Sequence, residues 1–212
     1  MKYIKLFESF EDYDPYELMI TPPNKKAEML IQEIKKKDKA NLNLVNDLIV
    51  LGANLDWQDD YGRTTLHYCA QYDHLDIARI LIDAGADVNI QNTAGWTALH
   101  WCAYHDLSEI AGMLIDAGSD LNIQTTDGWT ALHLYAINNH PGIVRMLIDA
   151  GADLNIQDTD GRTALHRCAS QNHPEILGIL IDAGADKTIP NNDGKLPYEL
   201  AKTKKMKTIL QP

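Results

Sequence analysis

Long apolar runs are missing from this 212-residue sequence. No stretch approaches the roughly 18–20 apolar residues that a helix needs to cross a bilayer. The first ten residues, MKYIKLFESF, place Lys5 and Glu8 inside their apolar stretch and offer no small-residue cleavage site, which argues against a secretory signal. We therefore expect a cytoplasmic protein with no membrane partner.

Positive charge is also scarce. The chain has 19 Lys and Arg residues against 30 Asp and Glu residues, a formal net charge of −11. Proteins that bind nucleic acids draw much of their affinity from clustered Lys and Arg side chains. A nucleic-acid partner is therefore not expected.

Catalytic motifs are absent as well. The sequence holds no G-x-S-x-G, no phosphate-binding loop and no H-E-x-x-H, each of which marks a class of enzyme. Aromatic residues make up only 7% of the chain, so the core must be built largely from Leu, Ile and Ala. An enzyme is the least favoured function, and no cofactor is expected.

What the sequence does contain is one motif written several times. GWTALH occurs at 95–100 and again at 128–133, and the LIDAGAD of 81–87 also returns. The glycines that open the copies follow one another at intervals of 33 residues: Gly62, Gly95, Gly128, Gly161 and Gly194. A fixed period of this size indicates a repeat protein whose stacked units bury a continuous core.

One unit, residues 59–91, predicts a pair of short helices. DDYG is a turn signal, and the Thr64 hydroxyl can cap the first turn of a helix. From Leu75 the apolar residues follow the 3.6-residue period of a buried helix, until Gly85 ends it with a left-handed cap. The aspartates of the following loop recur as turn-formers: Asp87, Asp120, Asp153 and Asp186.

Cysteine is rare, and its three copies stand at equivalent places in the repeats. Cys69, Cys102 and Cys168 each follow a histidine by two residues. Stacked helices lie ~8–10 Å apart, beyond the ~7 Å that separates the Cα atoms of a disulfide. Residues two apart on a helix point about 200° away from each other, so a shared Cys–His metal site is not expected. We predict free, buried thiols and no bound metal.

The repeated motifs resemble those of the ankyrin-repeat family. GRTTLHYCA, GWTALHWCA, GWTALHLYA and GRTALHRCA, with the closings GADVN, GSDLN and GADLN, are similar to the family's D-x-x-G-x-T-P-L-H-x-A-A opening and G-A-D-V-N close. The resemblance covers about nine-tenths of the chain and implies an all-α ankyrin-repeat solenoid. The chain departs from the family where proline is replaced, by Thr65, Ala98, Ala131 and Ala164.

The resemblance also assigns structural roles to residues that could otherwise suggest chemistry. It implies that one histidine of each repeat bonds the nearby Thr and the backbone of the adjoining unit: His67, His100, His133 and His166. A second set opens the second helix and is expected to serve the turn and its cap: His74, His140 and His173. Tyr135 stands where the other repeats have cysteine, and its ring requires local repacking.

The register divides the chain into seven segments. Residues 1–24 form a non-repeat leader, and 25–58 form an N-terminal capping helix pair. The full repeats are 59–91, 92–124, 125–157 and 158–190, and residues 191–212 form a C-terminal cap. Terminal units must present a polar side to water, so Lys202, Lys204, Lys205 and Lys207 are interpreted as a solvated outer face.

Positions that differ between repeats are candidates for binding. In ankyrin-like proteins such positions lie at the loop tips and along the inner helices, on a concave surface. Exposed Trp, Tyr and Arg are typical of interface hot spots. The predicted protein-binding residues are Arg63, Trp96, Trp129 and Arg162 after the repeat glycines, Tyr61, Asp127 and Asp160 at the tips, and Tyr72, Tyr104, His105, Ile137 and Asn138 near the inner-helix ends. The alternative is that each Trp lies flat across the neighbouring repeat.

We interpret the chain as a monomeric, non-catalytic module that binds a protein partner, whose identity the sequence does not give. The alternative is a structural or assembly component tethered by the leader. The leader holds Phe7, Phe10, Tyr13 and Tyr16 among acidic residues, and it could dock a partner, cover apolar surface of the body or be a disordered tail. Pro15, Pro22 and Pro23 are predicted to confine any leader helix to its first part.

Overall fold

The computed structural model describes residues 15–36 and 40–211, and these residues contain thirteen helices and no strands. The prediction of an all-α fold is therefore confirmed. The helices are α1 (Pro15–Ile20), α2 (Pro23–Ile34), α3 (Leu42–Val50), α4 (Thr65–Tyr72), α5 (Leu75–Asp83), α6 (Ala98–His105), α7 (Ser108–Asp116), α8 (Ala131–Asn138), α9 (Pro141–Asp149), α10 (Ala164–Gln171), α11 (Pro174–Asp182), α12 (Pro197–Leu200) and α13 (Lys204–Leu210).

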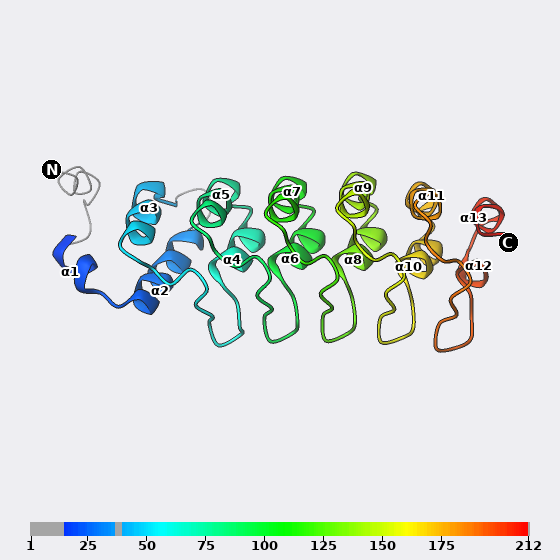
Figure 1. Ribbon diagram of the computed structural model, residues 1–212, viewed down its shortest axis with the longest axis horizontal. Helices are drawn as coiled ribbons and strands as arrows, with labels where there is room; N and C mark the ends of the chain where they lie inside the picture. Colours follow the sequence, from blue (N-terminus) through cyan, green and yellow to red (C-terminus); the bar gives the residue numbers. More distant parts are fainter. Residues whose placement is uncertain (1–14, 37–39, 212) are drawn as a thin grey trace.

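The helices of the repeats stand in two rows, with long loops projecting to one side (Figure 1). The inner row consists of α4, α6, α8 and α10, and the outer row of α5, α7, α9 and α11; each helix packs on the next of its own row. The core between the rows is mostly Leu, Ile and Ala, as the composition predicts. We call the surface formed by the loop tips and the inner row the inner-helix face.

Each inner helix begins directly after a threonine that is its N-cap: Thr64, Thr97, Thr130 and Thr163. Each outer helix ends just before a glycine with positive φ, for example Gly85 at +87°. Both boundaries were predicted. An L-residue is strained at such a φ, so glycine fixes the point at which the outer helix stops.

The loop tips form a continuous ladder from one repeat to the next. Thr93 N–H donates to the Tyr61 carbonyl at 3.0 Å, and the same bond recurs along the tips. A Cβ added to Gly128 would lie 2.7 Å from the nitrogen of Thr159 in the next tip. Glycine is therefore required here both for its φ of +77° and for the close approach of two backbones.

Two sets of amide side chains reinforce this ladder. Gln124 Nε2 donates to the carbonyls of Gly128, at 2.7 Å, and Gln157, at 3.1 Å, so one side chain joins two tips. The same pair of bonds is made by Gln58, Gln91 and Gln157. Asp120 acts as the predicted turn-former by accepting the Asn122 N–H at 3.0 Å, while Asn89 of the preceding repeat accepts the Asp120 N–H at 2.7 Å.

The N-terminal part differs from the prediction that prolines would confine any leader helix to its first residues. Helix α1 begins at Pro15 and α2 at Pro23, because proline at the start of a helix loses no hydrogen bond there. Leu18 on α1 is only 2% exposed and belongs to the core. The leader residues Phe7, Phe10 and Tyr13 lie outside the described part of the chain.

The C-terminal segment ends the stack with α12 and α13. Met206 and Leu210 are buried against the body, while the four predicted surface lysines are exposed. Lys207 Nζ lies 5.7 Å from the centre of the Tyr198 ring. No helix among residues 15–36 and 40–211 is long and apolar enough to cross a membrane.

The three cysteines are free and buried, as predicted. Burial raises the pKa of each thiol well above its ordinary value. At the equivalent place in the third repeat, Tyr135 is buried and its ring meets His140 edge-on at 5.9 Å. Its hydroxyl has no hydrogen-bond partner among the described residues. The larger side chain is therefore accommodated in the core with one polar atom unsatisfied.

Candidate functional site: the inner-helix face

The loop residues of the inner-helix face are held in place by the repeated Thr–His pairs. His100 Nε2 lies 3.1 Å from the Trp129 carbonyl, which only accepts hydrogen bonds, so Nε2 carries the proton. His100 Nδ1 then accepts from the Thr97 N–H at 3.2 Å and from the Thr97 hydroxyl at 2.8 Å. The other three pairs have the same arrangement. The structural role implied for these histidines is confirmed.

These histidines are held neutral. Burial lowers the pKa of His100 to about 4, although its hydrogen bond to the Trp129 carbonyl acts in the opposite direction. Burial likewise lowers the pKa of His67, His133 and His166. The carbonyls that they bond belong to Trp96, Trp129, Arg162 and Lys195. Three of the four histidines therefore fix the backbone of a candidate binding residue in the next repeat, and His166 fixes that of Lys195 in the C-terminal cap.

The histidines that precede the outer helices also bond the preceding repeat. His173 Nε2 lies 2.8 Å from the Ile137 carbonyl, and His74 Nε2 lies 2.6 Å from the Ile34 carbonyl. His140 Nδ1 instead meets the Asp106 carboxylate at 2.9 Å. Their expected place at the start of the helix is confirmed, but no side-chain bond caps their own helix; the bonds join neighbouring repeats.

In the first repeat, a cation is enclosed by tyrosines. Arg63 lies over the rings of Tyr61 and Tyr68, with its guanidinium carbon 4.8 Å and 4.6 Å from their centres. Asp59 accepts two bonds from this guanidinium, at 3.0 and 3.1 Å, and one from the Tyr68 hydroxyl at 2.6 Å. Burial opposes ionisation of Asp59, but the bonds from Tyr68 and Arg63 keep its pKa below the ordinary value. Arg63 is thus already paired.

The second repeat carries an aromatic cluster, which we define as Trp96, Trp101, Tyr104 and His105. The Trp96 ring meets Trp101 edge-on at 5.6 Å and Tyr104 edge-on at 5.8 Å. His105 stacks on Trp101 at 5.6 Å with 12° between the rings. Tyr104 is 63% exposed, whereas Trp96 is half-buried. The aromatic rings that Trp96 contacts, among the described residues, belong to its own repeat.

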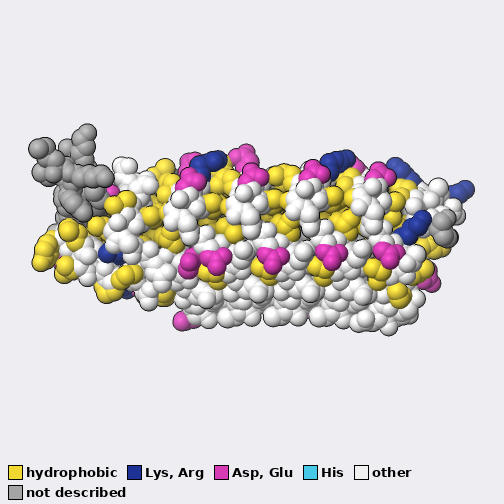
Figure 2. Space-filling model, viewed as in Figure 1, with side chains coloured by type: hydrophobic (Ala, Val, Ile, Leu, Met, Phe, Trp, Pro, Cys, Tyr) yellow, Lys and Arg dark blue, Asp and Glu magenta, His cyan; other side chains and the backbone are white. Residues whose placement is uncertain are grey.

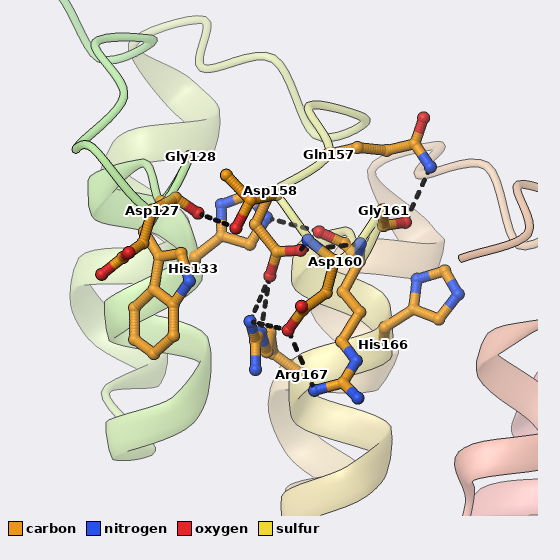
Figure 3. A network of polar contacts seen from close by, with 12 residues as sticks. Asp127, Gly128, His133, Gln157, Asp158, Asp160, Gly161, His166 and Arg167 are labelled. Atoms are coloured by element: carbon orange, nitrogen blue, oxygen red, sulfur yellow. Dashed lines mark hydrogen bonds and ion pairs between the residues drawn. The ribbon is translucent and has the colours of Figure 1, made fainter. Parts of the chain in front are cut away.

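Between the third and fourth repeats, Trp129 is half-buried beneath a cation. The Arg167 guanidinium carbon lies 4.5 Å from the centre of the Trp129 ring. Arg167 Nε donates to Asp158 at 2.8 Å, and Nη2 also bonds Asp158 and lies 3.5 Å from Asp160 (Figure 3). Arg162 Nη1 lies 3.6 Å from Asp160. Trp129 therefore contacts the neighbouring repeat through Arg167.

Several of the remaining candidate residues use a ring or a polar group in contacts within the chain itself. Tyr72 stacks on Tyr68 at 6.3 Å, and Asn138 Nδ2 donates to the Ala103 carbonyl at 2.9 Å. The Asp127 carbonyl accepts the Thr159 N–H at 3.1 Å, while the Asp127 side chain is exposed. Ile137 is half-buried. The twelve candidates therefore lie along the inner helices and tips rather than in one pocket, and most of them belong to the three groups described above.

Five residues of these groups were not among the predicted candidates: Asp59, Tyr68, Trp101, Asp158 and Arg167. Tyr68, Trp101 and Arg167 occupy one repeat position, whose remaining copy is Leu134. This position varies as strongly as that of Arg63, Trp96, Trp129 and Arg162, and the variation was the signal that could have identified it. The partners of Asp59 could not be predicted from the spacing of the sequence, because one lies four residues and the other nine residues further along the chain.

Among its described residues, the inner-helix face has no cluster of metal-binding side chains. In the described residues, no group of three or more His, Cys, Asp or Glu side chains gathers as a metal would require. A groove of about 430 Å³ lies away from this face, between the starts of the outer helices α7 and α9, and Glu109, His140 and Met146 contribute to its lining. None of the predicted binding residues lines it.

Comparison with known proteins agrees with the repeated geometry. A family model described as ankyrin repeats in three copies matches residues 30–125 and 109–191. A search of the curated proteins gives no match. The family match spans most of the chain, including the end of α2 and all of α3 to α11.

Proposed function

Since the chain belongs to the ankyrin-repeat family, whose members are in general protein–protein interaction modules, we propose that it binds a partner protein, without catalysis, through the inner-helix face. The observation that carries this proposal is the exposure of aromatic side chains on that face. Tyr61 is 64% and Tyr104 63% exposed, although both rings contact other side chains of their own repeat. Exposed Tyr on a rigid support is typical of an interface hot spot.

Trp96 and Trp129 are part of the proposed surface. They occupy equivalent places in adjacent repeats, so they stand about one repeat apart, ~10 Å by helix-packing distance. Both are half-buried and packed against the core. Their replacement is therefore expected to cost some stability as well as binding, unlike replacement of the more exposed tyrosines.

The test uses two double variants of the full chain. Trp96→Ala with Trp129→Ala should weaken capture of the native partner by at least ~2 kcal/mol, the usual threshold for a hot spot. Tyr61→Ala with Tyr104→Ala should weaken it also, with little change in thermal midpoint. Glu109→Ala with Arg145→Ala, two exposed outer-helix residues, is the control. Capture that all three variants retain would place the binding surface elsewhere.

The assembly role remains a second proposal because of the N-terminal end. Met19 and Ile20 on α1 are 49% and 66% exposed, and Val50 on α3 is 67% exposed, where an end unit is expected to be polar. Size-exclusion chromatography of native material separates the two roles. A recruiting module should elute as a monomer or with one stoichiometric partner, while an assembly component should co-purify with a large particle.

A further inference from the structure

Aromatic rings on the inner-helix face are covered by cations of the chain itself in two of the repeats, the first and the third. Arg63 covers Tyr61 and Tyr68, and Lys35 Nζ also lies over Tyr68, 4.8 Å from the ring centre. Arg167 covers Trp129. A cation over an aromatic face is attracted by the negative potential of the ring, so this contact recurs as a local way of stabilising the surface.

The aromatic cluster of the second repeat is the exception. No Lys or Arg of the described residues lies over Trp96, Trp101 or Tyr104. The cation–ring contacts of the described residues involve rings outside this cluster. The position that holds Arg63 and Arg162 in other repeats holds Trp96 here, and the position of Arg167 holds Trp101. His105 covers one face of Trp101. The Tyr104 ring, being 63% exposed, is the accessible aromatic surface of the cluster.

The charges around this cluster do not suit an acidic partner. The three arginines of the inner-helix face have aspartates beside them: Arg63 with Asp59, Arg167 with Asp158, and Arg162 with Asp160. The exposed Lys195 occupies the equivalent position three units beyond Trp96, roughly 30 Å away at ~10 Å per repeat. Asp60 and Asp127, at the neighbouring tips, are exposed and form no ion pair within the described residues.

We propose that the aromatic cluster of the second repeat receives an Arg or Lys side chain of the partner protein. The inference rests on the proposed function of the inner-helix face and names the chemistry of what binds there. The guanidinium or ammonium group lies against the open Tyr104 ring, supplying the contact that Arg63 and Arg167 supply in other repeats. A formal net charge of −11 also favours approach of a basic segment over an acidic one.

The probe is a library of random 12-residue peptides, selected on the immobilised full chain and eluted with soluble protein. Selected peptides are expected to carry an Arg or Lys whose replacement by Leu weakens binding roughly 2- to 30-fold, the range that a cation–ring contact provides. The same replacement should have little effect against Tyr104→Leu, and its full effect against Tyr104→Phe, which keeps the ring. This double-mutant cycle isolates the pairwise contact from general charge attraction.

The outcomes separate this inference from the proposed function. Peptides that lose binding to the Trp96→Ala, Trp129→Ala variant, yet tolerate replacement of every cation, would overturn the inference and leave the proposed function standing. Peptides whose cations matter equally against Tyr104→Leu would overturn it too. A selection that yields only peptides indifferent to the inner-helix face, or no peptide at all, would overturn both.

Discussion

Two kinds of glycine punctuate each repeat, and they are required for different reasons. Gly118 ends an outer helix at φ +83°, and a Cβ there would meet nothing within 4 Å. Gly128 turns the loop tip at φ +77°, where a Cβ would lie 2.7 Å from the Thr159 nitrogen. One position is constrained by backbone conformation alone, the other by conformation and by contact with the next repeat.

Alanine at these two glycines should therefore have unequal effects. We expect Gly118→Ala to lower the free energy of unfolding by ~1–2 kcal/mol, the cost of a left-handed L-residue. Gly128→Ala should cost a further ~1–3 kcal/mol, because the hydrogen bond between the Thr159 N–H and the Asp127 carbonyl must give way. Urea unfolding of both variants measures the difference. Equal losses would show that the tips can separate without cost.

The buried histidines should make stability depend on pH in the acid range. His100 has a folded pKa of about 4, against about 6.5 in an unfolded chain. Between these values the unfolded chain binds a proton that the folded chain excludes, so the free energy of unfolding falls as pH falls from ~6.5 to ~4. For His100 alone the loss is on the order of 3 kcal/mol.

Urea unfolding between pH 8 and pH 4.5 measures this loss. His100→Gln should show a shallower decline over that range than the unmodified chain, even if it is less stable throughout. The exposed neighbour His105 offers the control: His105→Gln should keep the full decline. A decline that His100→Gln leaves unchanged would assign the acid sensitivity to other groups.

The helices of the four repeats could be predicted from the sequence because every determinant recurs. Thr64 acts through a capping box with His67, three residues away, and Gly85 acts through its own backbone conformation; copies of both stand in each unit. Helix α1 could not be predicted in the same way, because proline is compatible both with the end of one helix and with the start of the next. In the structure Pro15 begins α1, and the burial of Leu18 shows that this helix packs on the body.

The sequence predicted where the candidate residues lie along the repeats, but it did not predict which side chains would pair with them. Tyr61, Trp96, Tyr104 and Trp129 do lie on the inner-helix face. Nothing in the sequence predicted that Asp59 and Asp160 would lie 3.0 and 3.6 Å from Arg63 and Arg162. Which acid meets which arginine depends on side-chain directions between loop and helix, which a residue interval does not encode.

Leu18 should contribute strongly to holding helix α1 against the body. Leu18 is 2% exposed and Met19, its neighbour on the same helix, is 49% exposed. We expect Leu18→Ala to lower the free energy of unfolding by ~2–5 kcal/mol, as for other buried leucines, and Met19→Ala to change it by less than ~1 kcal/mol. Chemical denaturation of the two full-length variants gives both values. If the two variants unfold alike, α1 does not contribute to the cooperative core.

Negative charge is spread over the molecule in register with the repeats. Figure 2 shows acidic side chains recurring along the repeats on the face in view. The exposed aspartates that end the outer helices are Asp83, Asp116, Asp149 and Asp182, and those of the following loops are Asp87, Asp120, Asp153 and Asp186. The stack therefore places like charges beside one another at each repeat, which opposes folding through self-repulsion.

This arrangement predicts that salt stabilises the fold. Neighbouring repeats stand ~10 Å apart, well within the ~30 Å screening length at 0.01 M salt and beyond the ~3 Å length at 1 M. The thermal midpoint should therefore rise between 0.01 M and 0.5 M NaCl. Asp149→Lys should raise the midpoint at low salt and lose that advantage at high salt, because it replaces repulsion from Asp116 and Asp182 by attraction. Asp149→Asn is the matched control, with about half the low-salt gain expected, since it removes the charge without reversing it. If the thermal midpoints of the unmodified chain and of both Asp149 variants do not change with salt, the rows of aspartates are too well solvated to repel one another.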